Sequence, residues 1–209
     1  QYHSDWITVE EESILVEHIE QLRFSEVRMH GVIAKRQVVH FGWDYEYDSW
    51  TISPTQPIPE WVLPFRARAA ALMIIPDAAI QEVLVTRYRP GAGIGWHRDA
   101  PMFGPAVLGM SLAGNCRMRF QRMVGRKRQT AEVLLKPRSC YMLAGASRFV
   151  WQHSIPPAKE LRYSLTFRTV KTDSRPSWKP SICRYEGRES GLISRGRSES
   201  EVQAQSGKH

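Results

Sequence analysis

The sequence predicts a mainly β protein with flanking helices, in which short strands close into a jelly-roll core or a barrel. Two observations lead to this prediction. Helical spacing of apolar residues is confined to two early segments, and about eight short candidate strands follow between residues 81 and 170. Strands that follow one another without intervening helices favour a jelly roll or barrel over a parallel sheet with crossover helices.

Two helices are predicted from capping residues and apolar periodicity. Thr8 and Glu11 have the spacing of a capping box, and apolar residues then recur at helical intervals over residues 9–22. A second helix is expected over residues 59–73, where Pro64 disturbs the first turn and an Ala-rich stretch follows.

The strands are predicted from β-type residues bounded by turn residues. One strand is expected between the helices, at Val38–Phe41, followed by an aromatic, Gly-containing loop with Trp43, Tyr45, Tyr47 and Trp50. The later candidates are Val83–Tyr88, Ile94–His97, Val107–Leu112, Cys116–Phe120, Ala131–Leu135, Cys140–Leu143, Phe149–His153 and Leu161–Thr169.

Length and composition indicate a single domain over residues 1–171, since 209 residues suffice for one substantial core. Residues 172–209 are rich in Ser, Arg, Gly and Glu and lack periodicity. Such a composition buries too little apolar surface to offset the entropy of ordering, so we expect a mostly disordered tail.

The sequence gives no indication of a membrane or secreted protein. The longest apolar run, Ala69–Ile75, is far shorter than the roughly 20 residues of a membrane span, and there is no signal pattern. Cys116 and Cys140 are expected to be reduced core residues, while Cys183 lies in the tail. The chain begins at Gln1 rather than Met, so we expect a trimmed chain. Separately, we expect a monomer that is cytoplasmic, or nuclear in a eukaryote.

The positive charge suggests a polyanionic partner. The formal net charge is +8, and a stretch of twelve residues contains six cations and no acid. General solubility is the alternative explanation, but the clustering favours nucleic acid. Because the stretch straddles a predicted hairpin, its cations could grip phosphates; they are Arg117, Arg119, Arg122, Arg126, Lys127 and Arg128.

Three residues have the composition of a metal site. His97 and Asp99, at i and i+2, would point to one face of a strand, and His153 could complete the set from another strand. Two imidazoles and one carboxylate are typical of non-haem iron(II) oxygenases, whereas zinc more often uses Cys or a third His. A structural role for the two histidines is the alternative.

The last predicted strand carries a polar face. Arg162, Ser164, Thr166 and Arg168 alternate with apolar or aromatic residues, so they share one side of the strand. Facing inward, two arginines would need anionic partners, and a dicarboxylate such as 2-oxoglutarate would supply them. A solvated edge strand is the alternative.

In this order the motifs resemble the AlkB family of iron(II)- and 2-oxoglutarate-dependent dioxygenases. The resemblance covers about residues 81–170, while the segment 28–80 resembles the family's substrate lid more loosely. The matching motifs are Arg87-Tyr88-Arg89-Pro90-Gly91, His97-Arg98-Asp99, Ser147-Arg148, His153-Ser154-Ile155-Pro156 and Arg162-Tyr163-Ser164-Leu165-Thr166-Phe167-Arg168.

The resemblance implies a double-stranded β-helix that carries iron on His97, Asp99 and His153 and uses dioxygen. It also implies that Arg162 binds the distal carboxylate of 2-oxoglutarate and that Arg168 lies near the keto-acid end. Tyr88 and Thr166 match further co-substrate positions. Thr86 and Ser164 stand where the repair enzymes carry Asn, and a hydroxyl can still hydrogen-bond there. Arg148 is expected to pair with Asp99 and fix its orientation.

The activity implied by the resemblance is oxidative demethylation of N-alkylated bases in DNA or RNA, as in DNA repair. The products would be formaldehyde, succinate and carbon dioxide. The base must be single-stranded or flipped to reach such a site, and Trp43, Tyr45 and Trp50 are candidates for stacking on it. Pro101 occupies a position where the bacterial repair enzyme has an acid, so the preferred base is left open.

Two alternatives remain open. The same oxygenase chemistry could act on a protein or a small molecule, with the basic hairpin incidental. The fold could also be an inactive nucleic-acid-binding module.

Overall fold

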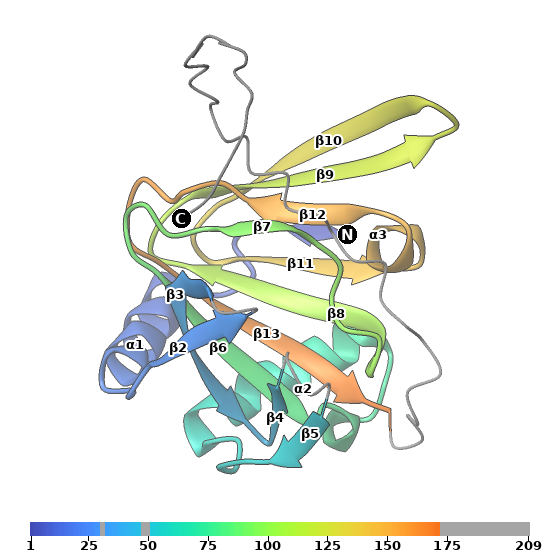
Figure 1. Cartoon of the computed structure of the whole chain (residues 1–209). Coiled ribbons are helices and arrows are strands. Elements are labelled where there is room, and N and C mark those ends of the chain that lie inside the picture. Colours follow the sequence, from blue (N-terminus) through green and yellow to red (C-terminus); the bar gives the residue numbers. More distant parts are fainter. Residues whose placement is uncertain (30–31, 47–50, 172–209) are drawn as a thin grey trace, which may run out of the picture. The chain divides into compact units, whose positions relative to one another are not determined.

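The structure is a computed structural model that describes residues 1–29, 32–46 and 51–171 (Figure 1). The predicted tail at 172–209, with Cys183, lies outside these residues, as do Tyr47 and Trp50. The domain boundary predicted at residue 171 therefore stays a prediction.

The described strands form two large antiparallel sheets and one small one, which confirms the mainly β fold. The seven-stranded sheet has the order β1-β11-β8-β13-β6-β3-β2, the four-stranded sheet β10-β9-β12-β7, and β4 pairs with β5. The strands are β1 (Tyr2–His3), β2 (Ser25–Met29), β3 (Val32–Phe41), β4 (Trp43–Glu46), β5 (Thr51–Pro54), β6 (Glu82–Tyr88), β7 (Ile94–His97), β8 (Phe103–Leu112), β9 (Cys116–Val124), β10 (Lys127–Leu135), β11 (Ser139–Ala144), β12 (Gln152–Ile155) and β13 (Arg162–Val170).

The first helix begins where the sequence predicts it, and the second predicted helix is divided into a 3-10 turn and an α-helix. Thr8 caps α1 (Val9–Glu20): its hydroxyl accepts from the Glu11 amide at 3.1 Å, and the Glu11 carboxylate accepts from the Thr8 amide at 2.9 Å. A short 3-10 helix, η1 (Glu60–Val62), leads into α2 (Leu63–Met73), whose first turn contains Pro64. Two further short helices are η2 (Asp77–Ala79) and α3 (Ala146–Phe149).

Two apolar cores result from this arrangement. The larger core joins α1 and α2 to one face of the seven-stranded sheet through residues such as Leu15, Phe65 and Leu165. The smaller core lies between the two large sheets and includes Tyr88, Met118 and other residues from both. Figure 1 shows the four-stranded sheet above the seven-stranded sheet, with the β9–β10 hairpin extending beyond the other strands. The space between the sheets is where inward-facing polar side chains meet.

Two local predictions are wrong. The predicted aromatic loop is in fact a hairpin, because Trp43 in β4 pairs with Pro54 in β5. Phe149 ends the short helix α3 rather than starting a strand, and β12 begins only at Gln152. Gly145 before this helix has a φ of +51°, a conformation that interrupts the extended chain and that glycine adopts without steric cost.

Two compositional predictions can also be compared with the structure. Cys116 and Cys140 are buried and free, as predicted. Among the described helices, none combines the length and the apolar character that a membrane crossing requires.

Candidate metal centre and co-substrate site

The predicted metal ligands meet between the two sheets, where His97 and Asp99 are partly exposed and His153 is buried. One ligand atom from each of His97, Asp99 and His153 lies within 4.8 Å of the others. Residues His97 and His153 are register partners across β7 and β12, and their ring centroids are 4.2 Å apart. Asp99 follows the end of β7 by two residues, so its carboxylate reaches the same place.

A backbone contact fixes the tautomer that His97 would need as a ligand. Its Nδ1 lies 2.8 Å from the Gly95 carbonyl oxygen, which can only accept a hydrogen bond. The proton therefore sits on Nδ1, and the Nε2 lone pair is left for a metal ion.

The electrostatics of the cluster favour the ligand-ready protonation state. Burial, then the nearby His153, lowers the pKa of His97 to about 3, and burial lowers the pKa of His153 as well. Burial alone would raise the pKa of Asp99, but Arg168 and the two histidines lower it below its ordinary value. At neutral pH the cluster therefore holds two neutral imidazoles and a carboxylate, as metal coordination requires.

Arg148 lies against Asp99, but not in the way we predicted. Instead of pairing with the Asp99 carboxylate, its guanidinium donates to the backbone carbonyls of Asp99 at 2.9 Å and Ala100 at 2.7 Å. Arg148 is only 2% exposed, and burial lowers its pKa. It thus fixes the chain segment that carries Asp99, while the carboxylate faces Arg168.

A second buried guanidinium lies deeper between the sheets. Arg162 is fully buried, its Nε donates to the Ser111 hydroxyl at 2.9 Å, and its guanidinium lies 5.0 Å from the centre of the Tyr88 ring. Among the residues that the structure describes, neither Nη1 nor Nη2 has a hydrogen-bond partner. A buried fork with two unsatisfied donors matches the geometry of a carboxylate.

Arg168 connects the three candidate ligands His97, Asp99 and His153, which we call the metal cluster, to the buried acid Glu82. Its Nη2 lies 3.5 Å from Asp99 Oδ1 and its Nη1 3.4 Å from Glu82 Oε1. The same Glu82 oxygen is 3.4 Å from His40 Nδ1, and His40 Nε2 is 3.5 Å from Asp44 Oδ1 on β4. A chain of charged and titratable groups thus runs from the metal cluster to the β4–β5 hairpin.

The remaining co-substrate residues lie on the same inner face. Thr86 is the register partner of Ser164 across β6 and β13, and both are 4% exposed. Thr166 is also buried and pairs with Gly109 of β8. The polar face predicted for the last strand therefore faces inward, whereas Tyr163, Leu165 and Phe167 pack in the larger core.

Comparison with known proteins agrees with this geometry. A sequence model of the 2OG-Fe(II) oxygenase superfamily matches residues 3–168. The chain belongs to this superfamily. Its members use iron(II), 2-oxoglutarate and dioxygen. The donor set of His97, Asp99 and His153 fits iron(II), and the unpartnered Arg162 nitrogens fit a carboxylate of 2-oxoglutarate.

The relatives place this oxygenase among AlkB-like proteins. A protein of Xenopus tropicalis named tRNA (carboxymethyluridine(34)-5-O)-methyltransferase alkbh8 is 28% identical over 163 residues, which are 74% of this chain and 24% of that protein. An Arabidopsis thaliana protein named Alkylated DNA repair protein ALKBH8 homolog is 26% identical over 216 residues, 87% of this chain and 59% of that protein. The oxygenase chain thus spans only about a quarter of the frog relative.

Solved structures agree on the fold. OsALKBH1 superposes with a TM-score of 0.67 at 15% identity, covering 80% of this chain and 95% of that one. A Pseudomonas putida prolyl-4-hydroxylase gives a TM-score of 0.59 at 12% identity, covering 82% and 92%. These likenesses confirm the jelly-roll fold of a 2-oxoglutarate oxygenase.

The sequence does not single out Tyr141, which packs against the core between the two sheets. Tyr141 on β11 pairs with Gly109, and a Cβ on Gly109 would overlap the Tyr141 ring. Burial raises the pKa of Tyr141, and the charges that act on it include those of Arg162 and Asp99. Alternation alone puts Tyr141 on one face of its strand, but only the pairing with Gly109 shows that this face is the inner one.

The predicted substrate residues are less completely described. Trp43 is partly buried on β4, while the Tyr45 side chain and all of Trp50 lie outside the described residues. The predicted basic hairpin is formed by β9 and β10, with Gly125 at a φ of +59° in the turn. Its cations lie at Arg117, Arg119, Arg122, Arg126, Lys127 and Arg128.

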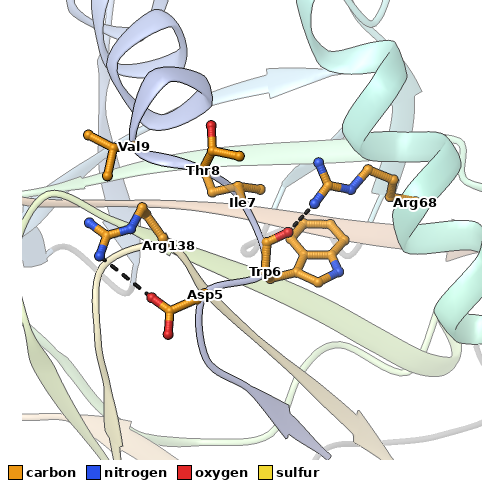
Figure 2. Close-up of a pocket in the computed structure, with 7 residues that line it drawn as sticks. All are labelled: Asp5, Trp6, Ile7, Thr8, Val9, Arg68 and Arg138. Atoms are coloured by element: carbon orange, nitrogen blue, oxygen red, sulfur yellow. Dashed lines mark hydrogen bonds and ion pairs between the residues drawn. The ribbon is translucent and has the colours of Figure 1, made fainter.

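Two surface pockets lie outside the oxygenase's metal cluster. The first, about 390 Å³, is shown in Figure 2 and lined by Asp5, Trp6, Ile7, Thr8, Val9, Arg68 and Arg138. Both its cations are engaged: Arg68 donates to the Trp6 carbonyl and to Glu11, and Arg138 pairs with Asp5 and Glu12. This pocket therefore has no free charge for a ligand. The second, about 470 Å³, is lined by Trp96, Arg119, Phe120, Thr130, Ala131 and Glu132.

Proposed function

We propose that this chain oxidises an N-alkyl group on a base of nucleic acid, and that the alkyl carbon leaves as an aldehyde. The observation that carries the proposal is the cation-rich β9–β10 hairpin, which is hydrogen-bonded to the strand that holds His153. A net charge of +8 and relatives named for tRNA or for alkylated DNA support it. We take RNA as the first substrate to test.

In this proposal His97, Asp99 and His153 hold iron, and their protonation state at neutral pH suits that task. Bound iron would let dioxygen oxidise 2-oxoglutarate and the substrate together: one oxygen atom would go to succinate, formed with loss of carbon dioxide, and the other to the substrate. Arg148 contributes as a positioning residue, because it anchors the backbone of Asp99.

The co-substrate would lie along the inner face of β13 and β6. Arg162 would bind its far carboxylate through Nη1 and Nη2, with the guanidinium held by Ser111 and Tyr88. Arg168 lies beside Asp99 and therefore suits the keto-acid end. Thr86, Ser164 and Thr166 would line the space between them with hydroxyl groups.

The substrate base would approach the metal cluster from the side of His97 and Asp99, which are partly exposed. A methyl group on nitrogen would be hydroxylated at carbon, and the resulting N-hydroxymethyl group would break its C–N bond to give formaldehyde and the unmodified base. Trp43, Tyr45 and Trp50 remain the predicted stacking residues for this base. Residues around the metal would keep the reacting carbon away from bulk water.

Incubation with N-methylated RNA and DNA oligonucleotides, followed by mass spectrometry, tests the proposal. With iron(II) and 2-oxoglutarate, the intact protein should remove the mass of one methylene group per lesion and release formaldehyde. His153→Ala should do neither. A protein that consumes 2-oxoglutarate in an iron-dependent way but leaves every methylated base unchanged would contradict the nucleic-acid assignment.

A protein substrate is not favoured by any particular feature of the described residues. The likeness to a prolyl-4-hydroxylase concerns the fold alone. The expectation of a monomer stays a prediction.

A further inference from the structure

The β9–β10 hairpin has two chemically different sides. In an antiparallel pair, register partners project to the same side and successive residues to opposite sides. Phe120 is the register partner of His153, which in turn is the partner of His97. The rings agree with this, since the Phe120 and His153 centroids are 6.2 Å apart. One side of the hairpin therefore continues directly from the metal cluster.

We call this the iron-facing side. It comprises, by register, Phe120, Arg122 and Val124 on β9 and Lys127, Gln129 and Ala131 on β10. The opposite side comprises Arg117, Arg119, Gln121 and Met123 on β9 and Arg128, Thr130 and Glu132 on β10. The hairpin cations are thus divided between a side that leads to the metal and a side that faces away from it.

On the iron-facing side, Arg122 is held in place without being neutralised. Its Nε donates to Gln129 Oε1 at 2.8 Å, and its guanidinium lies 4.7 Å from the centre of the Trp151 ring. Gln129 is neutral, and among the described residues no acid forms an ion pair with Arg122 or Lys127. Stacking on an aromatic ring orients an arginine fork and leaves its charge for an anion.

The opposite side is partly neutralised. Arg117 Nη1 and Glu132 Oε1 are 2.9 Å apart, and Arg119 is the register partner of the same glutamate while lying 5.3 Å from the centre of the Trp96 ring. A phosphate approaching this side would meet the carboxylate of Glu132 as well as the cations. It would also be on the wrong face of the sheet to deliver a base to His97 and His153.

We propose that the iron-facing side of the hairpin, through Arg122 and Lys127, binds the phosphate backbone of single-stranded RNA and guides the target base to the metal cluster. Arg122 lies two residues beyond Phe120, about 7 Å farther along the strand. A strand held there has its bases within reach of His97 and Asp99, the two partly exposed residues of the cluster. This inference rests on the proposed function and specifies which of the hairpin cations serve it.

The test compares two arginines on one strand. Arg122→Gln and Arg119→Gln remove the same charge from opposite sides of β9, and Lys127→Gln with Arg128→Gln repeats the comparison on β10. The dissociation constant for a short fluorescein-labelled single-stranded RNA is measured by anisotropy at several salt concentrations. Circular dichroism spectra of all four variants control for folding.

Arg122→Gln is expected to weaken RNA binding about tenfold, since a lost charge-assisted phosphate contact is worth that order of change. The slope of log K against log salt should fall in magnitude by about 0.7, the value for one phosphate contact on a single strand. Arg119→Gln should leave both quantities nearly unchanged. Lys127→Gln should resemble Arg122→Gln, and Arg128→Gln should resemble Arg119→Gln.

Equal losses from the two sides of the hairpin would overturn the inference, because they would mean a general attraction to positive charge. Absence of RNA binding by the intact protein, or tighter binding of DNA of the same sequence, would overturn it as well. The proposed function fails separately: if the intact protein binds RNA with the expected pattern but oxidises no methylated base, the surface stands and the reaction does not. If instead the intact protein demethylates the base and Arg122→Gln does so equally well, the reaction stands and the proposed RNA-binding surface does not.

Discussion

Replacement of Arg162 by methionine should separate co-substrate binding from folding. The Arg162 guanidinium is fully buried, its Nε donates to Ser111, and its two terminal nitrogens have no hydrogen-bond partner within the described part of the chain. Methionine keeps most of the side-chain length and removes the charge. The substitution therefore takes away the proposed carboxylate fork while it fills the same space.

The expected effect on stability without ligand is small, because opposing contributions nearly cancel. Loss of the Ser111 hydrogen bond costs about 1 kcal/mol and loss of the Tyr88 contact about 0.5–2 kcal/mol. Removing buried unsatisfied donors gains about 1–3 kcal/mol. The free energy of unfolding of the ligand-free protein should therefore change by no more than about 1–2 kcal/mol.

The expected effect on 2-oxoglutarate binding is large. Truncating one partner of a buried charged pair costs about 2–5 kcal/mol, which corresponds to a roughly 30- to 4000-fold rise in the dissociation constant. Thermal unfolding with iron(II) under anaerobic conditions and increasing 2-oxoglutarate measures both quantities. At a ligand concentration of about 100 Kd of the intact protein, that protein gains about 2.7 kcal/mol, and Arg162→Met should gain less than about 1 kcal/mol.

Arg162→Lys provides the matched control, since it keeps a positive charge but not the fork, and should bind with intermediate affinity. If Arg162→Met bound 2-oxoglutarate within a few-fold of the intact protein, the fork would not be the carboxylate site. If Arg162→Met failed to fold without ligand, the gain from removing unsatisfied donors would not offset the lost Ser111 and Tyr88 contacts.

Three further predictions concern the surroundings of the site. Glu82→Gln should raise the KM for 2-oxoglutarate more than it lowers kcat, because Glu82 orients Arg168 rather than touching the reacting atoms; equal changes in both would argue against this role. Gly109→Ala should destabilise the fold by about 1–3 kcal/mol in thermal unfolding, because its Cβ would overlap the Tyr141 ring. Gly95→Ala, whose Cβ meets nothing within 4 Å, should change stability by less than about 0.5 kcal/mol. In the metal-free protein, the free energy of unfolding should fall as pH drops below about 6.5. The histidines of the unfolded chain then bind protons, whereas in the fold burial lowers the pKa of His97 to about 3 and also lowers that of His153. The loss should be at most about 1.4 kcal/mol per pH unit for each group, and His97→Ala should reduce the slope; an unchanged slope would mean that His97 is protonated in the fold.

Local signals account for the elements that the sequence predicted well. The Thr8–Glu11 capping box lies within four residues, and the start of α1 follows from it without any distant contact. The polar face of β13 follows in the same way from alternation over residues 162–168. The aromatic segment after Phe41 was misjudged because its pairing partner, β5, carries little strand signal in its four residues.

The sequence by itself determined which side chains can form an iron and 2-oxoglutarate site, because the type of each side chain and its order along the chain can be read without the fold. Only the tertiary structure decided how they are used. Arg148 donates to the Asp99 carbonyl rather than to its carboxylate, and Arg168 lies beside that carboxylate. Tyr141 is brought opposite Gly109 by the pairing of β11 with β8. Strand register divides the hairpin cations, which are alike in sequence, into those on the same side as His153 and those on the opposite side. The physical reason is that alternation fixes which residues share a side of a strand, whereas pairing with distant strands fixes which side faces the site.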